Sequence, residues 1–509
     1  MRKIVKILSS RLFVCIVLIA LQIWLLISWL YNTAVAHAAL PSTEILAIIM
    51  SVYVINRQED SAYKIGWCFL MLALPVFGCT MYLLCVGRKM PQSLADGTIH
   101  ANDRMKGLLS QDGNVRKDLD EKIPEKKRLF TYGLEKSGFP VCEHTRAQYF
   151  GSGEEWFPVF LEELKKARRF IFLEYFIIDK GSMWDETLDV LKQKVKEGVE
   201  VKIIYDDFGC VALPARYDRT LNEMGIETYK FNRLRPALMI TMNNRDHRKL
   251  AIIDNQVGFT GGLNLADEYV NRITRFGYWR DSALMIKGEA VWSMTVMFLG
   301  MYSFLKKDDD NIDYSRYHLP LEQAYDETGF FQPFSDTPTD DADMGLSAHL
   351  NLINTARKYV YIDTPYLILN DAMKTALILA ASNGVDVRIL TPHVPDKQMA
   401  FQMTRGNYEE LLRGGVKIYE YTPGFNHTKN IVTDDDCGLA GSINTDYRSY
   451  YLHFEDGILF HDRKTAVSMR EAFEKGLAQS HQVTLEDCRK VPLALRIVIS
   501  LVSLFAPLF

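Results

Sequence analysis

The sequence has no regular cysteine pattern. Its eight cysteines are scattered, four of them fall in strongly apolar segments, and no Cys-x-x-Cys pair occurs. Their spacing therefore indicates neither a disulfide framework nor a cysteine-based zinc site. An excess of positive charge is also absent, because 59 Lys and Arg residues face 63 Asp and Glu residues, for a formal net charge of −4. This balance disfavours a general nucleic-acid-binding protein, so any anionic ligand must be bound by local charges.

Long uncharged apolar runs are present near the N-terminus. Residues 12–31 (LFVCIVLIALQIWLLISWLY) follow four basic residues, and residues 65–87 form a second such run. Each is long enough to cross the hydrocarbon core of a bilayer at about 1.5 Å per residue. A cleaved signal peptide would have a shorter apolar core and a cleavage site of small residues. We therefore expect residues 1–90 to form a membrane anchor.

Two further apolar segments leave the topology open. Residues 45–55 are apolar but short, and extending them to spanning length includes Glu44 and His37, so the anchor contains two or three transmembrane helices. The side of the membrane on which the rest of the chain lies depends on this number, because basic residues flank both ends of the anchor. Residues 491–509 are barely of spanning length and contain Arg496. They predict a helix at the membrane interface, with a buried core helix as the alternative.

The rest of the chain has the pattern of a duplicated α/β protein. Residues 91–130 are polar and charged and are expected to form a linker or surface arm. Helical patterns then alternate with strand-like runs in residues 131–334 and again in residues 345–490, joined by an acidic, proline-containing connector at residues 335–344. EGVEVKII matches NGVDVRIL, and MGIETYKF matches GGVKIYEY. The pattern predicts two pseudo-symmetric α/β halves with mixed, largely parallel sheets flanked by helices.

One motif occurs once in each half. The first copy is HRKLAIIDNQVGFTGGLN at residues 247–264, and the second is HTKNIVTDDDCGLAGSIN at residues 427–444. A single His-x-Lys pattern is weak, because an isolated histidine beside an apolar run is usually structural. Two copies with identical offsets in a duplicated frame indicate a shared site. The candidate catalytic residues are His247, Lys249, Asp254, His427, Lys429 and Asp434, and the candidate phosphate-binding residues are Asn264 and Asn444.

The chemistry of the two motifs suits transfer of a phosphoryl group. Side chains two residues apart on a strand point to the same face, so each histidine lies beside its lysine. If the halves pack about a two-fold axis, both motifs converge on one cationic pocket. One neutral imidazole can then attack phosphorus while the other protonates the leaving alkoxide, and no metal or other cofactor is required. Asp281 and Glu455, each on the strand that follows a motif, are expected to orient the histidines.

The paired motif resembles the phospholipase D superfamily over most of residues 130–490. Together with YWRD, TPY, GFNHTK, YRSYYLHFE and the apolar N-terminal runs, it is similar more narrowly to bacterial cardiolipin synthases. The resemblance implies a multi-pass phosphatidyltransferase of the bacterial plasma membrane whose partners are phosphatidylglycerol and membrane lipids, not nucleic acid. One phosphatidylglycerol would form a phosphatidyl-enzyme and release glycerol. A second would then attack through its free hydroxyl to give cardiolipin.

The resemblance also implies a role for each motif residue. His247 is the expected nucleophile and His427 the expected acid and base, although the pseudo-symmetry of the halves leaves the choice between them open. Within the catalytic motifs, Asp254 and Asp434 are the expected structural partners. Glu455 is the carboxylate expected to orient His427.

Other activities fit the same residues. Water in place of the lipid hydroxyl would give a phospholipase D-type hydrolase, and another alcohol such as serine would give a different phosphatidyltransferase. The apolar runs and the absence of a basic stripe disfavour a nuclease of the superfamily. The intact His, Lys and Asn residues in both motifs argue against a non-catalytic membrane scaffold. Acyl-chain preference, the preferred alcohol and the oligomeric state stay open.

Overall fold

The computed structural model describes residues 11–31, 34–57, 61–85, 92–233, 244–307, 313–339 and 342–503. The chain forms two compact units. The first consists of Met1–Leu94, Leu234–Asn244 and Ala494–Phe509, and the second of Ala95–Arg233 and Arg245–Leu493. Five of the basic residues expected to flank the anchor lie outside the described residues, namely Arg2, Lys3, Lys6, Arg88 and Lys89.

The helices of the first unit coincide with the apolar runs of the sequence. They are α2 (Arg11–Leu30), α3 (Ala34–Ile55), α4 (Ser61–Ala73), α5 (Pro75–Cys85) and most of α20 (Leu493–Ser503). The run 65–87 is divided between α4 and α5 because Pro75 has no N–H to continue the preceding helix and is favoured at the first position of a new one. Trp67 and Tyr82 pack edge to face, with ring centroids 5.3 Å apart, in the small core of this unit.

The membrane anchor stays a prediction. Within the part of the chain that the structure describes, none of the helices combines the length and the apolarity needed to cross a bilayer. The short apolar segment 45–55 belongs to α3, a helix of 22 residues that contains Pro41. The C-terminal segment is helical as far as Ser503, and residues 504–509 lie outside the described residues.

The segment 91–130, expected to form a linker or surface arm, is largely helical. Its helices are α6 (Gln92–Lys106), α7 (Gly113–Lys122) and α8 (Arg128–Tyr132), followed by the π-helical turn η1 (Gly133–Ser137). Val115 and Leu119 are buried together because a spacing of four residues places them on one face of α7. The charged residues of α7 lie mostly on its exposed face, so composition alone suggested a solvated arm.

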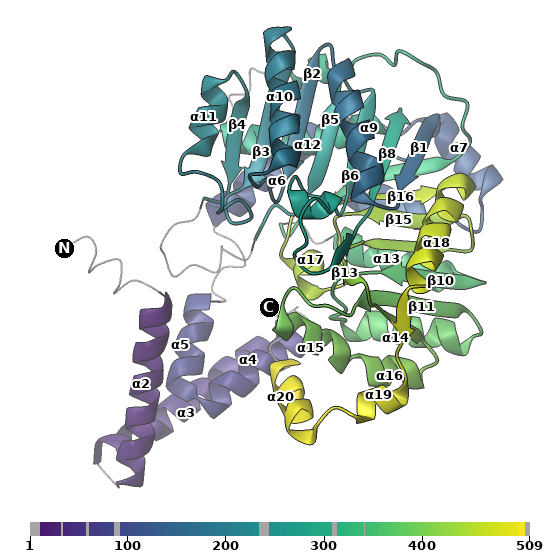
Figure 1. The fold of residues 1–509 in the computed structure, drawn as a ribbon. Helices are drawn as coiled ribbons and strands as arrows, with labels where there is room; N and C mark the ends of the chain where they lie inside the picture. The colour runs from purple at the N-terminus through teal and green to yellow at the C-terminus, as the bar shows by residue number, and fades with distance from the viewer. Residues whose placement is uncertain are drawn as a thin grey trace. The chain divides into compact units, whose positions relative to one another are not determined.

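The first repeat of the second unit builds a seven-stranded sheet with the order β1-β8-β6-β5-β2-β3-β4. Its strands are β1 (Thr145–Phe150), β2 (Phe170–Tyr175), β3 (Glu200–Asp206), β4 (Glu227–Phe231), β5 (Lys249–Ile253), β6 (Val257–Gly261) and β8 (Ala283–Gly288). Its helices are α9 (Gly153–Lys166), α10 (Ser182–Lys196), α11 (Tyr217–Glu223), η3 (Asp267–Val270), α12 (Val291–Lys306) and η4 (Tyr314–Tyr317). Helices α9 and α10 cover one face (Figure 1), and Phe172 stacks on Phe298 of α12 on the other.

The second repeat builds an eight-stranded sheet with the order β17-β12-β11-β10-β14-β15-β16-β9. Its strands are β9 (Phe330–Asp336), β10 (Tyr359–Asp363), β11 (Asp386–Pro392), β12 (Lys417–Tyr421), β14 (Asn430–Thr433), β15 (Cys437–Gly441), β16 (Glu455–His461) and β17 (Ser480–Gln482). Its helices are α13 (Met344–Thr355), α14 (Asp371–Ser382), α15 (Gln398–Gly406), α16 (Tyr408–Arg413), α17 (Tyr447–Tyr451), α18 (Arg463–Leu477) and α19 (Leu485–Arg489). The two repeats thus give similar sheets.

The second repeat begins earlier than the sequence suggested. Strand β9 includes the first residues of the expected connector and pairs antiparallel with β16 over its whole length. Asp336, at the end of β9, accepts hydrogen bonds from the N–H groups of Met344 and Gly345, which begin α13. The expected connector is therefore in part a buried strand tied to the next helix, and residues 340 and 341 lie outside the described residues.

The prediction of largely parallel sheets was also wrong. In the first sheet only the β2–β3 and β3–β4 pairs are parallel, and in the second only β10–β11 and β11–β12. All other pairs in the two sheets are antiparallel. The cause is a tight turn inside each motif, where Asp254 and Asn255 in one half, and Asp434 and Asp435 in the other, adopt positive φ angles. Such turns join neighbouring strands as hairpins, whereas parallel strands need a long crossover.

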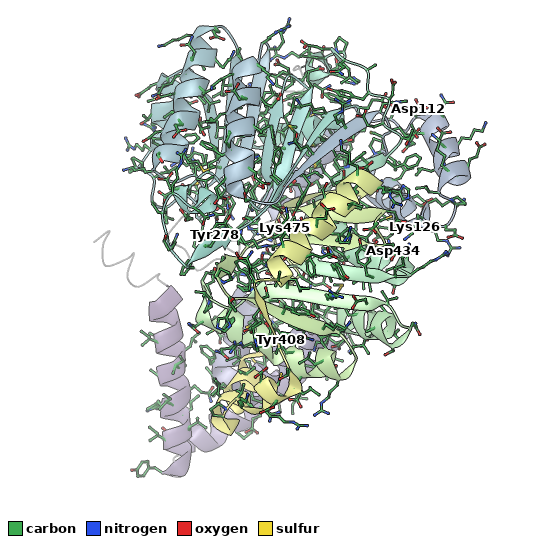
Figure 2. The ribbon with its side chains drawn as sticks, turned by 45° about the vertical axis from the view of Figure 1, so that its right-hand side comes forward. Asp112, Lys126, Tyr278, Tyr408, Asp434 and Lys475 are labelled. Atoms are coloured by element: carbon green, nitrogen blue, oxygen red, sulfur yellow. The ribbon has the colours of Figure 1, made fainter. Side chains whose placement is uncertain are left out.

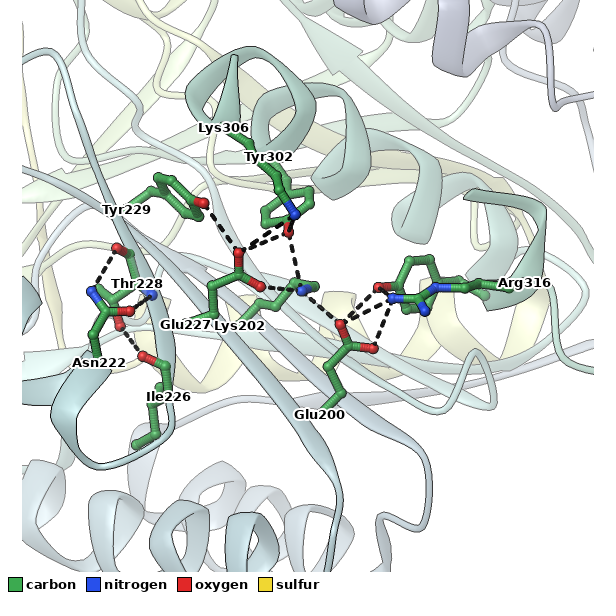
Figure 3. Close-up of polar contacts among 11 residues, drawn as sticks. Glu200, Lys202, Asn222, Ile226, Glu227, Thr228, Tyr229, Tyr302, Lys306 and Arg316 are labelled. Carbon is green, nitrogen blue, oxygen red and sulfur yellow. Dashed lines mark hydrogen bonds and ion pairs between the residues drawn. The ribbon is translucent and has the colours of Figure 1, made fainter. Parts of the chain in front are cut away.

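A buried lysine joins the first sheet to α12 (Figure 3). Lys202 is 2% exposed, and its ammonium group contacts the carboxylates of Glu200 and Glu227 and the hydroxyl of Tyr302. Tyr302 in turn donates a hydrogen bond of 2.9 Å to Glu227. A buried charge is tolerated when it is paired in this way, so the network fixes β3 and β4 against the helix without leaving a desolvated ammonium.

Each motif aspartate acts as an acceptor for three backbone N–H groups. Asp254 accepts hydrogen bonds of 2.6 to 2.8 Å from the residues that lead into β2, Arg168 to Phe170. Asp434 accepts bonds of 2.8 to 3.1 Å from the corresponding residues, Arg357 to Tyr359. Lys126 also lies 3.3 Å from Asp434 (Figure 2). The carboxylates therefore hold the turn of each hairpin against the start of the neighbouring strand, β2 or β10.

We predict that Asp254→Ala lowers the free energy of unfolding by about 2–4 kcal/mol, because buried N–H groups lose their acceptor at a cost of about 1–3 kcal/mol each and alanine disfavours a positive φ. Asp254→Asn keeps one carbonyl acceptor and tolerates the turn, so it should cost less. Urea unfolding of the full chain measures both values. Asp189→Ala, which removes an exposed carboxylate paired with Lys192, is the control. Equal stability of Asp254→Ala and the wild type would contradict the capping role.

Candidate active site

The motif histidines occupy corresponding positions at the start of the two hairpins. His247 lies two residues before the first residue of β5, and His427 lies three residues before β14. Both are nearly buried, at 7% and 9% exposure. Asp254 follows Lys249 by five residues, about 16 Å further along at about 3.3 Å per strand residue. The motif aspartates are thus at the opposite end of the strand from the histidines.

Main-chain hydrogen bonds tie each histidine to the other half of the protein. Strand β13 (Gly424–Asn426), between the two sheets in Figure 1, pairs in parallel with β7 (Tyr278–Arg280) of the first half. Directly after it, the N–H of His427 donates to the carbonyl of Arg280 at 2.7 Å. The first half repeats this arrangement, because the N–H of His247 donates to the carbonyl of Phe454 at 2.9 Å. Both histidines therefore lie at the junction of the two repeats.

An arginine secures one of these crossings. Arg280 is buried and donates to both carboxylate oxygens of Asp363, at 2.6 and 3.1 Å, and to Asn426 at 2.7 Å. The bidentate geometry fixes β7 of the first half against β10 and β13 of the second. The crossing is therefore a rigid feature of the fold.

The orienting carboxylates are exchanged between the halves. His427 Nδ1 lies 2.6 Å from Asp281 Oδ2, and His247 Nδ1 lies 2.9 Å from both carboxylate oxygens of Glu455. The expected pairing of Glu455 with His427 was therefore wrong. The reason is the main-chain crossing, since Asp281 follows Arg280 and Glu455 follows Phe454, the two residues that bind the opposite histidine.

The difference between Gly-Gly in the first motif and Gly-Ser in the second follows from the carboxylate beside each. In the second half, the hydroxyl of Ser442 donates to Glu455 and accepts from the N–H of Asp456 at 2.9 Å. In the first half, a Cβ atom on Gly262 would lie only 1.9 Å from Asp281 Oδ1. A glycine is therefore required beside Asp281, whereas a serine helps to hold Glu455.

The motif lysines are buried beside their histidines, as the spacing predicted. Lys249 and Lys429 are 2% and 3% exposed, and each ammonium group donates to the carbonyl of its own motif histidine. Lys429 Nζ also lies 2.9 Å from His427 Nδ1. The charge of Lys249 acts on His427 as well as on His247, so the two motifs form one electrostatic site.

Burial sets the protonation of this site. Burial and Lys429 lower the pKa of His427 to about 4 against the opposing effect of Asp281, and burial likewise lowers the pKa of His247 well below its usual value. Burial also lowers the pKa of Lys249 to about 8 and that of Lys429 to about 7. Burial opposes ionisation of Glu455, but His247 outweighs it and lowers the Glu455 pKa. The site thus combines neutral imidazoles with ionised carboxylates.

The two motif asparagines differ in their surroundings. The side-chain oxygen of Asn264 accepts from the N–H of Ile177 at 2.9 Å, and its amide donates to the hydroxyl of Tyr269 at 2.7 Å. Among the described residues, the buried side-chain oxygen of Asn444 has no hydrogen-bond partner. Asn264 is thus held by protein groups, while Asn444 retains capacity for a ligand.

Sequence reasoning missed aromatic side chains that contact the histidines. Trp279 lies 5.1 Å from His427, and His453 lies 5.3 Å from His247, between ring centroids. Both occur two residues before an orienting carboxylate, in YWRD and LHFED. This shared position could have identified the two residues from the sequence. The histidine that each of them contacts follows only from the crossing of the halves.

Known proteins share this architecture and sequence. The family model for the cardiolipin synthase, PLD-like domain, matches residues 160–289 and again residues 349–477, and a phospholipase D-nuclease N-terminal model matches residues 45–85. The solved phosphatidylserine synthase of Haemophilus influenzae has a similar fold, with a TM-score of 0.54 and 14% sequence identity over 73% of this chain and 96% of that one.

Relatives extend the similarity over most of the chain. An uncharacterized protein of Streptococcus mutans is 40% identical over 465 residues, which cover 90% of this chain and 99% of the relative. A cardiolipin synthase of a Geobacillus species is 32% identical over 467 residues, or 91% of this chain and 92% of the relative. The repeated family match and these relatives agree with the duplicated fold. The chain belongs to the cardiolipin synthase family of phospholipase D-like proteins.

Proposed function

We propose that the chain is a cardiolipin synthase, which transfers a phosphatidyl group from one phosphatidylglycerol to another and releases glycerol. The observation that carries this proposal is the pair of buried His-x-Lys motifs, each histidine bonded to a carboxylate of the opposite half. The family relationship supports the same activity. Two imidazoles and two ammonium groups in one site suit an anionic phosphodiester substrate.

In the first step, His247 attacks phosphorus. Because its Nδ1 faces Glu455, a neutral ring donates that N–H to the carboxylate and presents the Nε2 lone pair to the substrate. The P–O bond to glycerol breaks, and His427 gives a proton to the leaving oxygen. The negative phosphate adds a second countercharge to that of Asp281, and this raises the pKa of His427 when the substrate is bound.

In the second step, the free hydroxyl of a second phosphatidylglycerol attacks the phosphatidyl-histidine. His427, now neutral, accepts the hydroxyl proton, and the P–N bond to His247 breaks to release cardiolipin. Lys249, Lys429 and Asn444 bind the non-bridging oxygens, whose charge increases in both transition states. Asn264 supports the same pocket through its bond to Tyr269. Every atom transferred comes from the two lipids.

An enzyme whose substrates are membrane lipids is expected to be attached to the membrane. We assign the attachment to residues 1–90, as a multi-pass anchor in a bacterial plasma membrane, with residues 491–509 at the membrane interface. The support is the length of the two uncharged sequence runs and the large apolar side chains exposed on α2, such as Ile16 and Trp24.

Purified full-length chain given only phosphatidylglycerol should produce cardiolipin and glycerol in equal amounts. His247→Ala and His427→Ala should each lower the rate by at least about 100-fold, because each removes a group that acts on the reacting bonds. Lipid mass spectrometry and glycerol quantification measure both products. Phosphatidic acid as the main product would assign a hydrolase instead, and turnover in either variant near the wild-type rate would rule out the two-histidine mechanism.

The crossed carboxylates can be tested with phosphatidyl-p-nitrophenol, whose leaving group departs without an acid. Asp281→Asn and His427→Ala should keep a burst of nitrophenol and accumulate the phosphatidyl-enzyme. Glu455→Gln and His247→Ala should lose the burst, because they impair the nucleophile.

Which variants behave alike shows which carboxylate acts with which histidine. If Glu455→Gln behaves like His427→Ala, the crossing has no catalytic role. If the two pairs exchange behaviour as pairs, the crossing stands and His427 is the nucleophile. Mass spectrometry of the trapped protein, digested at alkaline pH to preserve the phosphohistidine, identifies the modified histidine.

The loss of activity with rising pH should steepen through about 7 to 8, beyond the gradual fall that deprotonation of His427 above about pH 4 causes. The lysines bind phosphate only in their protonated form, and the lowered pKa values of about 7 for Lys429 and about 8 for Lys249 place their loss of charge in this range. The pH profile of kcat/KM reports the free enzyme and measures this limb. Lys429→Arg, if active, should move the limb to higher pH, because arginine stays charged. A constant kcat/KM up to pH 9 would contradict this assignment.

A further inference from the structure

A third imidazole lies beside the presumed nucleophile. The ring of His453 is tilted by 41° against that of His247, and its Nδ1 lies 3.5 Å from Glu455 Oε1. Glu455 therefore stands between two histidines. His453 is 9% exposed, and among the described residues neither of its ring nitrogens has a hydrogen-bond partner. Buried polar atoms normally have a partner, so this ring has unused capacity for a ligand.

The fold itself does not require a histidine at this position. The corresponding residue of the other half is Trp279, which contacts His427 and has Nε1 3.4 Å from Asp281. An indole offers a donor but no lone pair. Only the His247 side of the site therefore has a second nitrogen that can bind a metal.

We propose that His247, His453 and Glu455 form a binding site for a divalent cation of the zinc class, and that occupation of this site blocks the transfer reaction. One ligand atom from each of the three side chains lies within 4.8 Å of the others. Two imidazole nitrogens and one carboxylate oxygen are a donor set that zinc takes in proteins, with a fourth position for water or a substrate oxygen.

Binding of the cation would remove the groups that the reaction uses. When Nδ1 of His247 coordinates the cation, the ring proton moves to Nε2, so Nε2 no longer has a free lone pair, and Glu455 turns from orienting the ring to holding the metal. A metal-bound His247 is a poor nucleophile, so transfer stops. This consequence rests on the proposed function, whereas the binding itself does not.

The charges around the cluster permit a dication. Lys249 and Lys429 are positive, but the carboxylates of Glu455, Asp281 and Asp456 face Lys249 and offset them.

A second cluster, formed by Asp436, Cys437 and His461, also has ligand atoms within 4.8 Å of one another. There, Lys126 already provides a positive charge 3.7 Å from Asp436 Oδ1 and 3.3 Å from Asp434. The cluster is therefore the weaker candidate and provides a matched control.

Equilibrium dialysis of the full chain against Zn²⁺ tests the proposal directly. The wild type should bind one Zn²⁺ that His453→Phe, which keeps a ring but removes both nitrogens, binds at least about 100-fold more weakly. His247→Ala should lose the cation as well. His427→Ala, which is expected to be equally inactive, and Cys437→Ser should both retain it. His453→Asn serves as a second variant if the phenylalanine variant does not fold.

The outcomes separate this inference from the proposed function. Zinc bound by the wild type and lost in the His453 and His247 variants supports the site, even if the chain converts no phosphatidylglycerol. Zinc lost in Cys437→Ser but retained in His453→Asn overturns it, as does failure of the wild type to bind. In an active preparation, Zn²⁺ should inhibit cardiolipin formation and a chelator should restore it. Full activity with the site occupied would overturn the blocking role.

Discussion

The active site depends on two backbone hydrogen bonds that join the repeats. The N–H of each motif histidine donates to a carbonyl of the opposite half, at Phe454 for His247 and at Arg280 for His427. The next residue along each of those strands carries the carboxylate that binds the same histidine. Neither repeat therefore contains a complete His–carboxylate pair, and loss of either crossing would separate one histidine from its orienting group.

Burial gives the site its reactivity. An imidazole in water would be partly protonated near neutral pH, whereas the buried histidines have lowered pKa values and stay neutral. The same burial would be costly for isolated charges, but Glu455 and Asp281 each accept hydrogen bonds from a histidine, which offsets the desolvation. The lysines remain close to losing their charge, so a phosphate is their natural counterion.

The sequence predicted which residues form this site better than it predicted how the strands pair and which residues contact one another. Repeated offsets identified the histidines, lysines and duplicated frame, because they depend only on local spacing. The antiparallel hairpins were missed, because parallel sheets were predicted from the general alternation of strands and helices, whereas the turn at Asp254 and Asn255 joins neighbouring strands directly. The exchange of Asp281 and Glu455 could not be read from spacing, because it depends on contacts between repeats about 180 residues apart.

The two halves differ where they touch the histidines. A glycine lies beside Asp281 and a serine beside Glu455, while Trp279 contacts one imidazole and His453 the other. A perfectly symmetric site would give both histidines the same environment and the same tendency to attack. The reaction instead needs one ring that forms a covalent bond and one that moves protons. Substitutions at these paired positions, within a frame that keeps both histidines in place, make the two rings chemically distinct.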